Sequence, residues 1–427
     1  MLLISLGACN NKKEVRTYHL PDMVRLFEMG ENDRSPETLK AFGDTLITAN
    51  RDLKASQLYI EAATQYHKSG DGTKMIKALN LAIDQGMANP KVLDRFTGHE
   101  SALATPEGQK LLKRLDSIQK QLAEVSHYDL EMRSMEQFWP YFERAIADTS
   151  KARVELKKFL FEGPPEIRDF YSVRYANLDM MFGQMINASP DYYQHLKSQV
   201  RPDSLQAVQE TTKKWMQRFK ELYPQAIFPK VYIVPGILNS GGTVTEMGMF
   251  IGGDMYGRSK NMPTEGLSDW QKNSIMSFEQ LPGLTIHELM HFQQNYTDTV
   301  NIEYVKGAII SEGVCDFLVE LSSGKPLENA NLSYLDEPEN MAFILEDLKN
   351  DLNNTDNSKW LYNGGSIEDR PHDLGYTLGY LISKSYYENH PDKKQAIFEL
   401  LNTDNFEAIY KGSAYGYLLE TDTTKVF

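Results

Sequence analysis

The chain has 427 residues, of which 41% are hydrophobic, and its formal net charge is -14. This length exceeds the usual size of a single domain, so we expect two folded units, each with a core of its own. The acidic balance, without a basic patch, excludes nucleic acid as a ligand and disfavours anionic membrane surfaces, because both need clustered lysine and arginine.

The first residues predict export and a lipid anchor. The stretch Leu6-Gly7-Ala8-Cys9 ends an apolar run and resembles the lipobox of bacterial lipoproteins, in which lipid is attached to the cysteine. The alternative is a plain apolar N-terminus, since the run is short for a signal peptide and lacks a positive region. We expect residues 1–33 to be a signal remnant and polar tether. Cys9 is then the only membrane attachment, at the periplasmic or outer-membrane surface of a bacterial cell envelope.

Residues 34–125 are predicted to form a helical domain. The stretch "SPETLKAF" supplies Ser35 as an N-cap and Pro36 at the first helical position. Residues 55–86 indicate two antiparallel helices joined by the turn "SGDG", each with one apolar stripe. Their small residues resemble tetratricopeptide helix pairs, although a plain helical bundle is the alternative because no second copy of the repeat is evident. Such a unit is typical of protein contacts, so a protein partner is expected here.

Residues 126–427 are predicted to form a second domain, in which dense aromatic residues and helices precede a small sheet. The stretch "PKVYIVPG" alternates like a short strand, and the β-prone run within residues 239–257 is flanked by glycine pairs. We therefore expect a mainly α fold with a small antiparallel β-sheet, of the α+β class. An open edge of that sheet would let a peptide substrate add itself as a strand.

The motif "TIHELMHFQQ" at residues 285–294 predicts a metal site. On a helix, His287 and His291 lie four residues apart and present their imidazoles to a common point. Glu288 projects beside them, where it can act as a base toward a water molecule. The alternative for these residues is a coincidence in a helix.

A second stretch, "IISEGVCDFLVELSSG", supplies the third ligand that a hydrolytic zinc site needs. Glu312 follows His291 by 21 residues, and Asp316 lies one helical turn further on the same face. Asp316 can accept the N–H of a ligand histidine and fix its tautomer. A solvated acidic helix face is the alternative, but the surrounding apolar residues favour a buried helix, where carboxylates need partners.

Two other third ligands are possible. Cys315, one of only two cysteines, is a donor that zinc accepts, but it points about 100° away from Asp316 on a helix. A histidine shortly after His291 would serve instead, and none occurs before His372. We therefore expect Glu312 to be the ligand and Cys315 to be a small core residue.

Several stretches together carry a family resemblance. They are "SGGTVTEMGMFIGGD", "HELMHFQQ", "SEGVCDFLVELSSGK", "DLGYTLGYLI" and "YYENHPDKKQAI". From about residue 128 to its end, the chain resembles lipoproteins of Bacteroidetes-type bacteria that are predicted zinc-dependent proteases, related to a gliding-motility lipoprotein. The pairing of H-E-x-x-H with E-x-x-x-D also resembles the gluzincin metallopeptidases. These resemblances imply a zincin-like domain and hydrolysis of a peptide or protein substrate.

The expected reaction is peptide-bond hydrolysis by a zinc-activated water, with Glu288 moving the proton. A hydrogen-bond donor for the developing oxyanion is expected within "PHDLGYTLGY". We expect Tyr376 first and His372 second, while Tyr380 is expected to pack behind Tyr376. The alternative function is an envelope scaffold or binding protein without catalysis, which has no need of Glu288 beside the metal.

Overall fold

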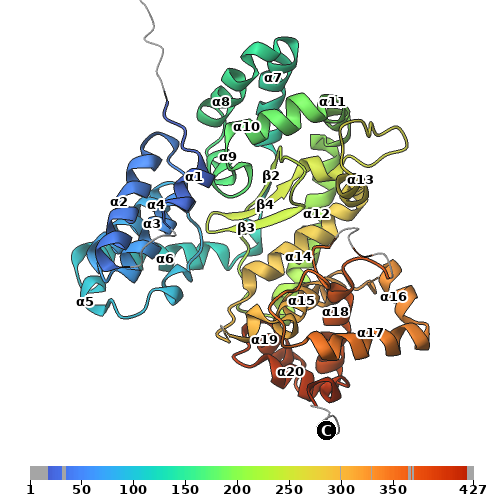
Figure 1. The fold of residues 1–427 in the computed structure, drawn as a ribbon. Coiled ribbons are helices and arrows are strands. Elements are labelled where there is room, and N and C mark those ends of the chain that lie inside the picture. The colour runs from blue at the N-terminus through green and yellow to red at the C-terminus, as the bar shows by residue number, and fades with distance from the viewer. Residues whose placement is uncertain are drawn as a thin grey trace, which may run out of the picture.

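The structure is a computed structural model that describes residues 18–30, 35–298, 300–327, 329–363, 367 and 370–420. The fold is mainly α-helical with one small sheet, as predicted (Figure 1). Within the described ranges, no helix has both the length and the apolar character needed to cross a bilayer. Cys9 lies outside the described residues, so its lipidation stays a prediction.

The N-terminal part of the described chain is a group of helices, at the left of Figure 1. It comprises α1 (Met23–Glu28), α2 (Pro36–Leu53), α3 (Ser56–Lys68), α4 (Gly72–Asp84), α5 (Glu100–Leu103) and α6 (Pro106–Leu122). Ser35 caps α2 by accepting a hydrogen bond from the Thr38 N–H, as predicted. The predicted turn between α3 and α4 is also present, with Gly70 at a φ of 79°.

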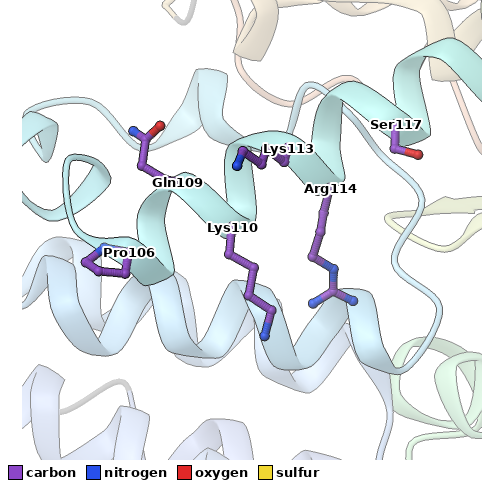
Figure 2. Close-up of a pocket in the computed structure, with 6 residues that line it drawn as sticks. All are labelled: Pro106, Gln109, Lys110, Lys113, Arg114 and Ser117. Carbon is purple, nitrogen blue, oxygen red and sulfur yellow. The ribbon is translucent and has the colours of Figure 1, made fainter.

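One basic side chain of α6, Arg114, reaches α4. Figure 2 shows Lys110, Lys113 and Arg114 along a shallow pocket on this helix. Arg114 reaches α4, where its guanidinium donates hydrogen bonds to Asp84 Oδ1 at 2.7 Å and to the Asn80 carbonyl at 3.0 Å. This arginine therefore joins two helices of the group.

Aromatic-rich helices follow and surround the sheet (Figure 1). They are α7 (Arg133–Ala147), α8 (Ala152–Glu162), α9 (Glu166–Phe170), α10 (Leu178–Phe182), α11 (Pro190–Gln199) and α12 (Pro202–Leu222). A π-helical turn, Tyr171–Tyr175, continues α9, and a second one, Gly183–Ala188, continues α10. Turns of this kind are rare and occur often at functional sites.

The sheet has the strand order β1-β2-β4-β3. Its strands are β1 (Leu130–Glu131), β2 (Val231–Val234), β3 (Gly242–Thr245) and β4 (Gly248–Gly252). β3 and β4 are antiparallel, with Thr243 opposite Phe250, whereas β1, β2 and β4 run parallel. The predicted sheet is therefore present but mixed rather than wholly antiparallel.

The parallel pairing arises because the predicted β-prone run contains a turn and forms two strands, which the sequence analysis treated as one. The single β-prone run breaks at residues 246–247 into two strands, and Gly248 has a φ of 150° at this break. After β2 the chain therefore forms β3 at the edge and returns as β4 between β3 and β2. This order leaves β3 as an edge strand of the described sheet.

The C-terminal helices occupy the lower half of Figure 1. They are α14 (Leu281–Gln293), α15 (Val305–Ser323), α16 (Ala330–Leu335), α17 (Pro338–Asp351), α18 (Leu374–Asn389), α19 (Lys393–Asn402) and α20 (Phe406–Gly412). The short helix α13 (Asp269–Ser274) precedes them and lies higher, at the right of the sheet. A Cβ atom at Gly379 of α18 would lie 1.8 Å from the Ile309 carbonyl oxygen of α15. Glycine therefore lets α15 and α18 pack backbone against backbone.

Candidate metal centre

The two histidines of "HELMH" lie on one face of α14 and point to a common position. His287 and His291 are one helical turn apart, and their Nε2 atoms are separated by 3.1 Å. His287 is buried, whereas His291 is half-buried. The spacing of the motif on a helix thus brings together two nitrogen donors, as predicted.

Glu312 on α15 completes a triangle of donor atoms. Its Oε2 atom lies 3.3 Å from His287 Nε2 and 3.2 Å from His291 Nε2. Tetrahedral zinc with bonds of about 2.0 to 2.1 Å separates neighbouring ligand atoms by about 3.3 to 3.4 Å. The two nitrogens and the carboxylate oxygen therefore fit a zinc ion in both chemistry and spacing.

Each imidazole is held through its other nitrogen. Asp316 Oδ1 lies 2.9 Å from His287 Nδ1, and Gln294 Oε1 lies 3.0 Å from His291 Nδ1. An acceptor at Nδ1 takes that N–H and leaves Nε2 free to bind a metal. The structure thus places Asp316 at its predicted position and adds Gln294, which also donates from Nε2 to the Ser311 carbonyl at 2.7 Å.

Cys315 belongs to an alternative donor set. One donor atom each from His287, His291 and Cys315 lie within 4.8 Å of one another. Cys315 Sγ, however, is 3.5 Å from Nδ1 of His291, on the opposite side of the ring from the Nε2 atom that faces Glu312. Burial raises the pKa of the Cys315 thiol to about 11. A bound zinc ion would deprotonate a thiol, so the direction of Cys315 Sγ, and not its protonation state, favours Glu312 as the third ligand.

The charges of this cluster depend on one another. Burial raises the pKa of Glu312, but hydrogen bonds from His287 and His291 outweigh it and hold the pKa well below its usual range. Burial lowers the pKa of His287, yet hydrogen bonds to Asp316 and Glu312 bring it well above its usual value. The buried carboxylate therefore stays ionised, and the site stabilises positive charge between the three donors.

Glu288 faces the edge of the sheet. A Cβ atom at Gly242 of β3 would lie 2.1 Å from Glu288 Oε1, so any larger residue there would displace the Glu288 carboxylate. Glu288, the three donor residues and β3 line one cavity of about 810 Å³. The predicted base therefore shares a cavity with the donor triangle, beside a strand edge.

The two predicted oxyanion donors, Tyr376 and His372, and their neighbour Tyr380 lie in different places. Tyr376 lines the cavity, and its ring centroid is 6.1 Å from that of His287. Tyr380, one helical turn further along α18, donates a hydrogen bond to Glu320 of α15. His372 is exposed and lies outside the lining of the cavity. Tyr376 thus shares the cavity with the donor triangle, whereas His372 does not.

Tyr362 was missed by the sequence analysis. Its hydroxyl donates a hydrogen bond of 2.5 Å to Oε1 of Glu312, the oxygen that does not face the histidines. Its backbone has a φ of 58°, which is rare for an aromatic residue and is typical of functional sites. The sequence gives no signal for this role, because Tyr362 lies in an irregular segment with no periodic pattern.

Comparison with known proteins finds one match, to part of the chain. Residues 269–407 match a family model described as "Predicted Zn-dependent protease (DUF2268)". The matched segment contains α14, α15 and α18, and thus His287, His291, Glu312 and Tyr376. No curated protein and no solved structure matches the chain. Over this segment, the chain is similar to a family of predicted zinc proteases.

Proposed function

We propose that this chain is a zinc-dependent peptidase of the gluzincin type. The observation that carries the proposal is the triangle of His287 Nε2, His291 Nε2 and Glu312 Oε2, with sides of 3.1 to 3.3 Å. Glu288 and Tyr376 line the same cavity as this triangle. The similarity of residues 269–407 to predicted zinc proteases supports the same conclusion.

His287, His291 and Glu312 are the proposed ligands of the zinc ion. Zinc with three protein ligands keeps a position open, and when bound it polarises a carbonyl and lowers the pKa of water to about 7. Asp316 and Gln294 hold the imidazoles in the required tautomer. Tyr362 holds the second oxygen of Glu312 and so fixes the direction of the first.

Glu288 is the proposed general base. It removes a proton from the attacking water as the water oxygen bonds to the carbonyl carbon of the substrate. When the carbon–nitrogen bond breaks, the same carboxyl group gives that proton to the leaving amine. The position of Glu288 beside Gly242 supports this role, because a peptide beside β3 would present its backbone there.

Tyr376 is the proposed donor to the oxyanion. Burial and the charge of Glu312 raise its pKa well above the ordinary value, so the phenol stays protonated and can donate. A donor aimed at the developing charge is commonly worth about 100-fold to 1,000-fold in rate. Tyr376 lies on α18, outside the two helices that carry the ligands.

The test compares zinc content and peptide cleavage in three full-length proteins. We expect the native chain to hold zinc and cut a broad peptide library, and Glu288→Gln to hold zinc without cutting. Glu312→Ala should bind zinc much more weakly, because it removes a ligand. Zinc in the native chain without any cleavage would refute the peptidase and favour the scaffold; equal zinc content in all three would refute the ligand assignment.

A further inference from the structure

One charged side chain in the cavity takes no part in the scheme above. Arg174 is half-buried and lines the cavity that also contains Glu288 and the donor triangle. Among the described residues that line it, Arg174 is the only lysine or arginine, whereas Glu288, Glu312, Asp316 and Asp373 are acidic. An anionic group of a ligand would therefore be attracted to one end of this cavity only.

The structure holds Arg174 in one position. Its Nε atom donates a hydrogen bond of 2.6 Å to Thr243 Oγ1 on β3, and its carbonyl accepts one from Asn239 Nδ2 at 3.0 Å. Arg174 belongs to the π-helical turn Tyr171–Tyr175, and Ala176, the residue that follows this turn, has a φ of 62°. A strained backbone beside a rare turn is typical of a side chain that is positioned for a ligand.

The end of the Arg174 guanidinium has no partner among the described residues. Its only side-chain hydrogen bond is made by Nε, and no described carboxylate forms an ion pair with it. Burial lowers the pKa of Arg174 below its ordinary value, and the nearby Glu288 and Tyr362 offset part of that effect. The two terminal nitrogens are thus a planar pair of donors, which matches the geometry of a carboxylate.

The distance from Arg174 to the reacting bond can be expressed in residues of substrate. Gly242 contacts Glu288, and the next residue, Thr243, contacts Arg174. A peptide lying along β3 advances about 3.3 Å per residue. A substrate whose scissile carbonyl lies beside Glu288 would therefore place a group within one or two residues of that bond against Arg174.

We propose that Arg174 binds a carboxylate of the peptide substrate, one or two residues from the bond that is cut. This inference rests on the proposed peptidase function and narrows its substrates to peptides with a carboxylate at that place. The carboxylate is either the C-terminus of the peptide, which gives an exopeptidase, or an aspartate or glutamate side chain.

The test measures peptide binding without turnover, using zinc-loaded Glu288→Gln protein. Three libraries of N-acetylated hexapeptides are offered. The first has free C-termini and contains no aspartate or glutamate. The second has amidated C-termini and contains aspartate and glutamate, and the third has amidated C-termini and contains neither residue. Peptides that remain bound are quantified by mass spectrometry. We expect the first or the second library to be enriched at least about 10-fold over the third, as for a charge-assisted bidentate pair. Enrichment of the first indicates the C-terminus, and that of the second indicates a side chain.

Arg174→Gln on the same background should abolish this enrichment, whereas Arg153→Gln should preserve it. Arg153 pairs with exposed Asp179 outside the cavity. If Arg174→Gln folds poorly, Arg174→Lys can replace it. Lysine keeps the positive charge but lacks the planar pair of donor nitrogens, so it should reduce the enrichment several-fold. Equal retention of all libraries, or enrichment that survives both Arg174 variants, would overturn the proposal. This binding test needs no catalysis. Failure of the native chain to cut peptides would therefore refute the proposed peptidase function without deciding whether Arg174 binds a carboxylate.

Discussion

Two tyrosines beside the donor triangle have different contacts and therefore different proposed tasks. Tyr362 donates its hydrogen bond to a ligand carboxylate, whereas Tyr376 has its ring beside His287 and a raised pKa. Their rings meet edge to face, with centroids 6.0 Å apart. One residue is placed to orient a ligand, and the other to contact a substrate.

Substitution of each tyrosine by phenylalanine separates these tasks. Tyr376→Phe should lower kcat by about 10-fold to 1,000-fold with little change in KM or zinc affinity, because only a transition-state contact is lost. Tyr362→Phe should weaken zinc binding by about 10-fold, since it releases Glu312. Steady-state kinetics and zinc titration measure both. A fully active Tyr376→Phe protein beside a Tyr362→Phe protein with normal zinc affinity and low kcat would reverse the assignment.

Which site residues could be predicted from sequence depends on local periodicity. His287 and His291, and likewise Glu312 and Asp316, are four residues apart on helices, so their common faces follow from sequence spacing alone. Gln294, Tyr362 and Arg174 come from a helix end, an irregular segment and a π-helical turn. Their positions depend on tertiary packing, which a single sequence does not report.

At the scale of elements, the approach of α18 to α15 determines where Glu312 lies. A Cβ atom at Gly313 would lie 2.0 Å from the Gly379 carbonyl carbon. The glycines of the two helices thus allow α18 to lie directly against the backbone of α15. The mixed pairing of the sheet was not predicted, because strand order depends on where the chain turns rather than on alternation of side chains.

Gly379→Ala tests this helix contact. The added methyl group would meet the Ile309 carbonyl oxygen at 1.8 Å, so the free energy of unfolding should fall by about 3 kcal/mol or more. Zinc affinity should fall as well, because α15 carries Glu312. Gly183→Ala is the matched control: Gly183 has helical φ and ψ and nothing within 4 Å of its Cβ position.

Urea unfolding measures both glycine variants. Gly183→Ala should leave stability unchanged or raise it by up to about 1 kcal/mol, since alanine suits a helix better than glycine. Similar stabilities for the two variants would contradict the account of the α15–α18 contact.

At the scale of the whole molecule, Asp169 joins the N-terminal helices to the sheet. This buried side chain on α9 accepts the Gln57 N–H at 2.8 Å, at the N-terminus of α3, and contacts Thr245 on β3. α3 has no side-chain cap from its own N-cap residue, Ala55. Sequence composition does not reveal a link of this kind between distant residues. The domain boundary near residue 125 stays a prediction.

Asp169→Asn tests this link through pH. Burial raises the pKa of Asp169 from 3.8 to about 6, so the folded state disfavours the charged form. Its contribution to stability is therefore full below about pH 4 and is lost as the pH rises to about 6. Asparagine keeps an acceptor for Gln57 without the charge. Between pH 4 and pH 7, the native chain should lose roughly 2 to 3 kcal/mol relative to Asp169→Asn.

Free energies of unfolding at several pH values measure this difference. Asp169→Ala is the control, because it also removes the acceptor and should be less stable than Asp169→Asn at every pH, by about 1 kcal/mol. Parallel pH profiles of the native chain and Asp169→Asn would show that folding does not raise the pKa of Asp169, which would contradict this account.

The identity of the third metal ligand is the centre of the account, and zinc K-edge X-ray absorption of the zinc-loaded native protein tests it most directly. Coordination by His287, His291 and Glu312 predicts nitrogen and oxygen neighbours at about 2.0 to 2.2 Å and no sulfur. Cys315→Ser should leave that spectrum unchanged, whereas Glu312→Ala should alter it. A zinc–sulfur distance of about 2.3 Å in the native protein would contradict the proposed centre, because Cys315 would then be the ligand in place of Glu312.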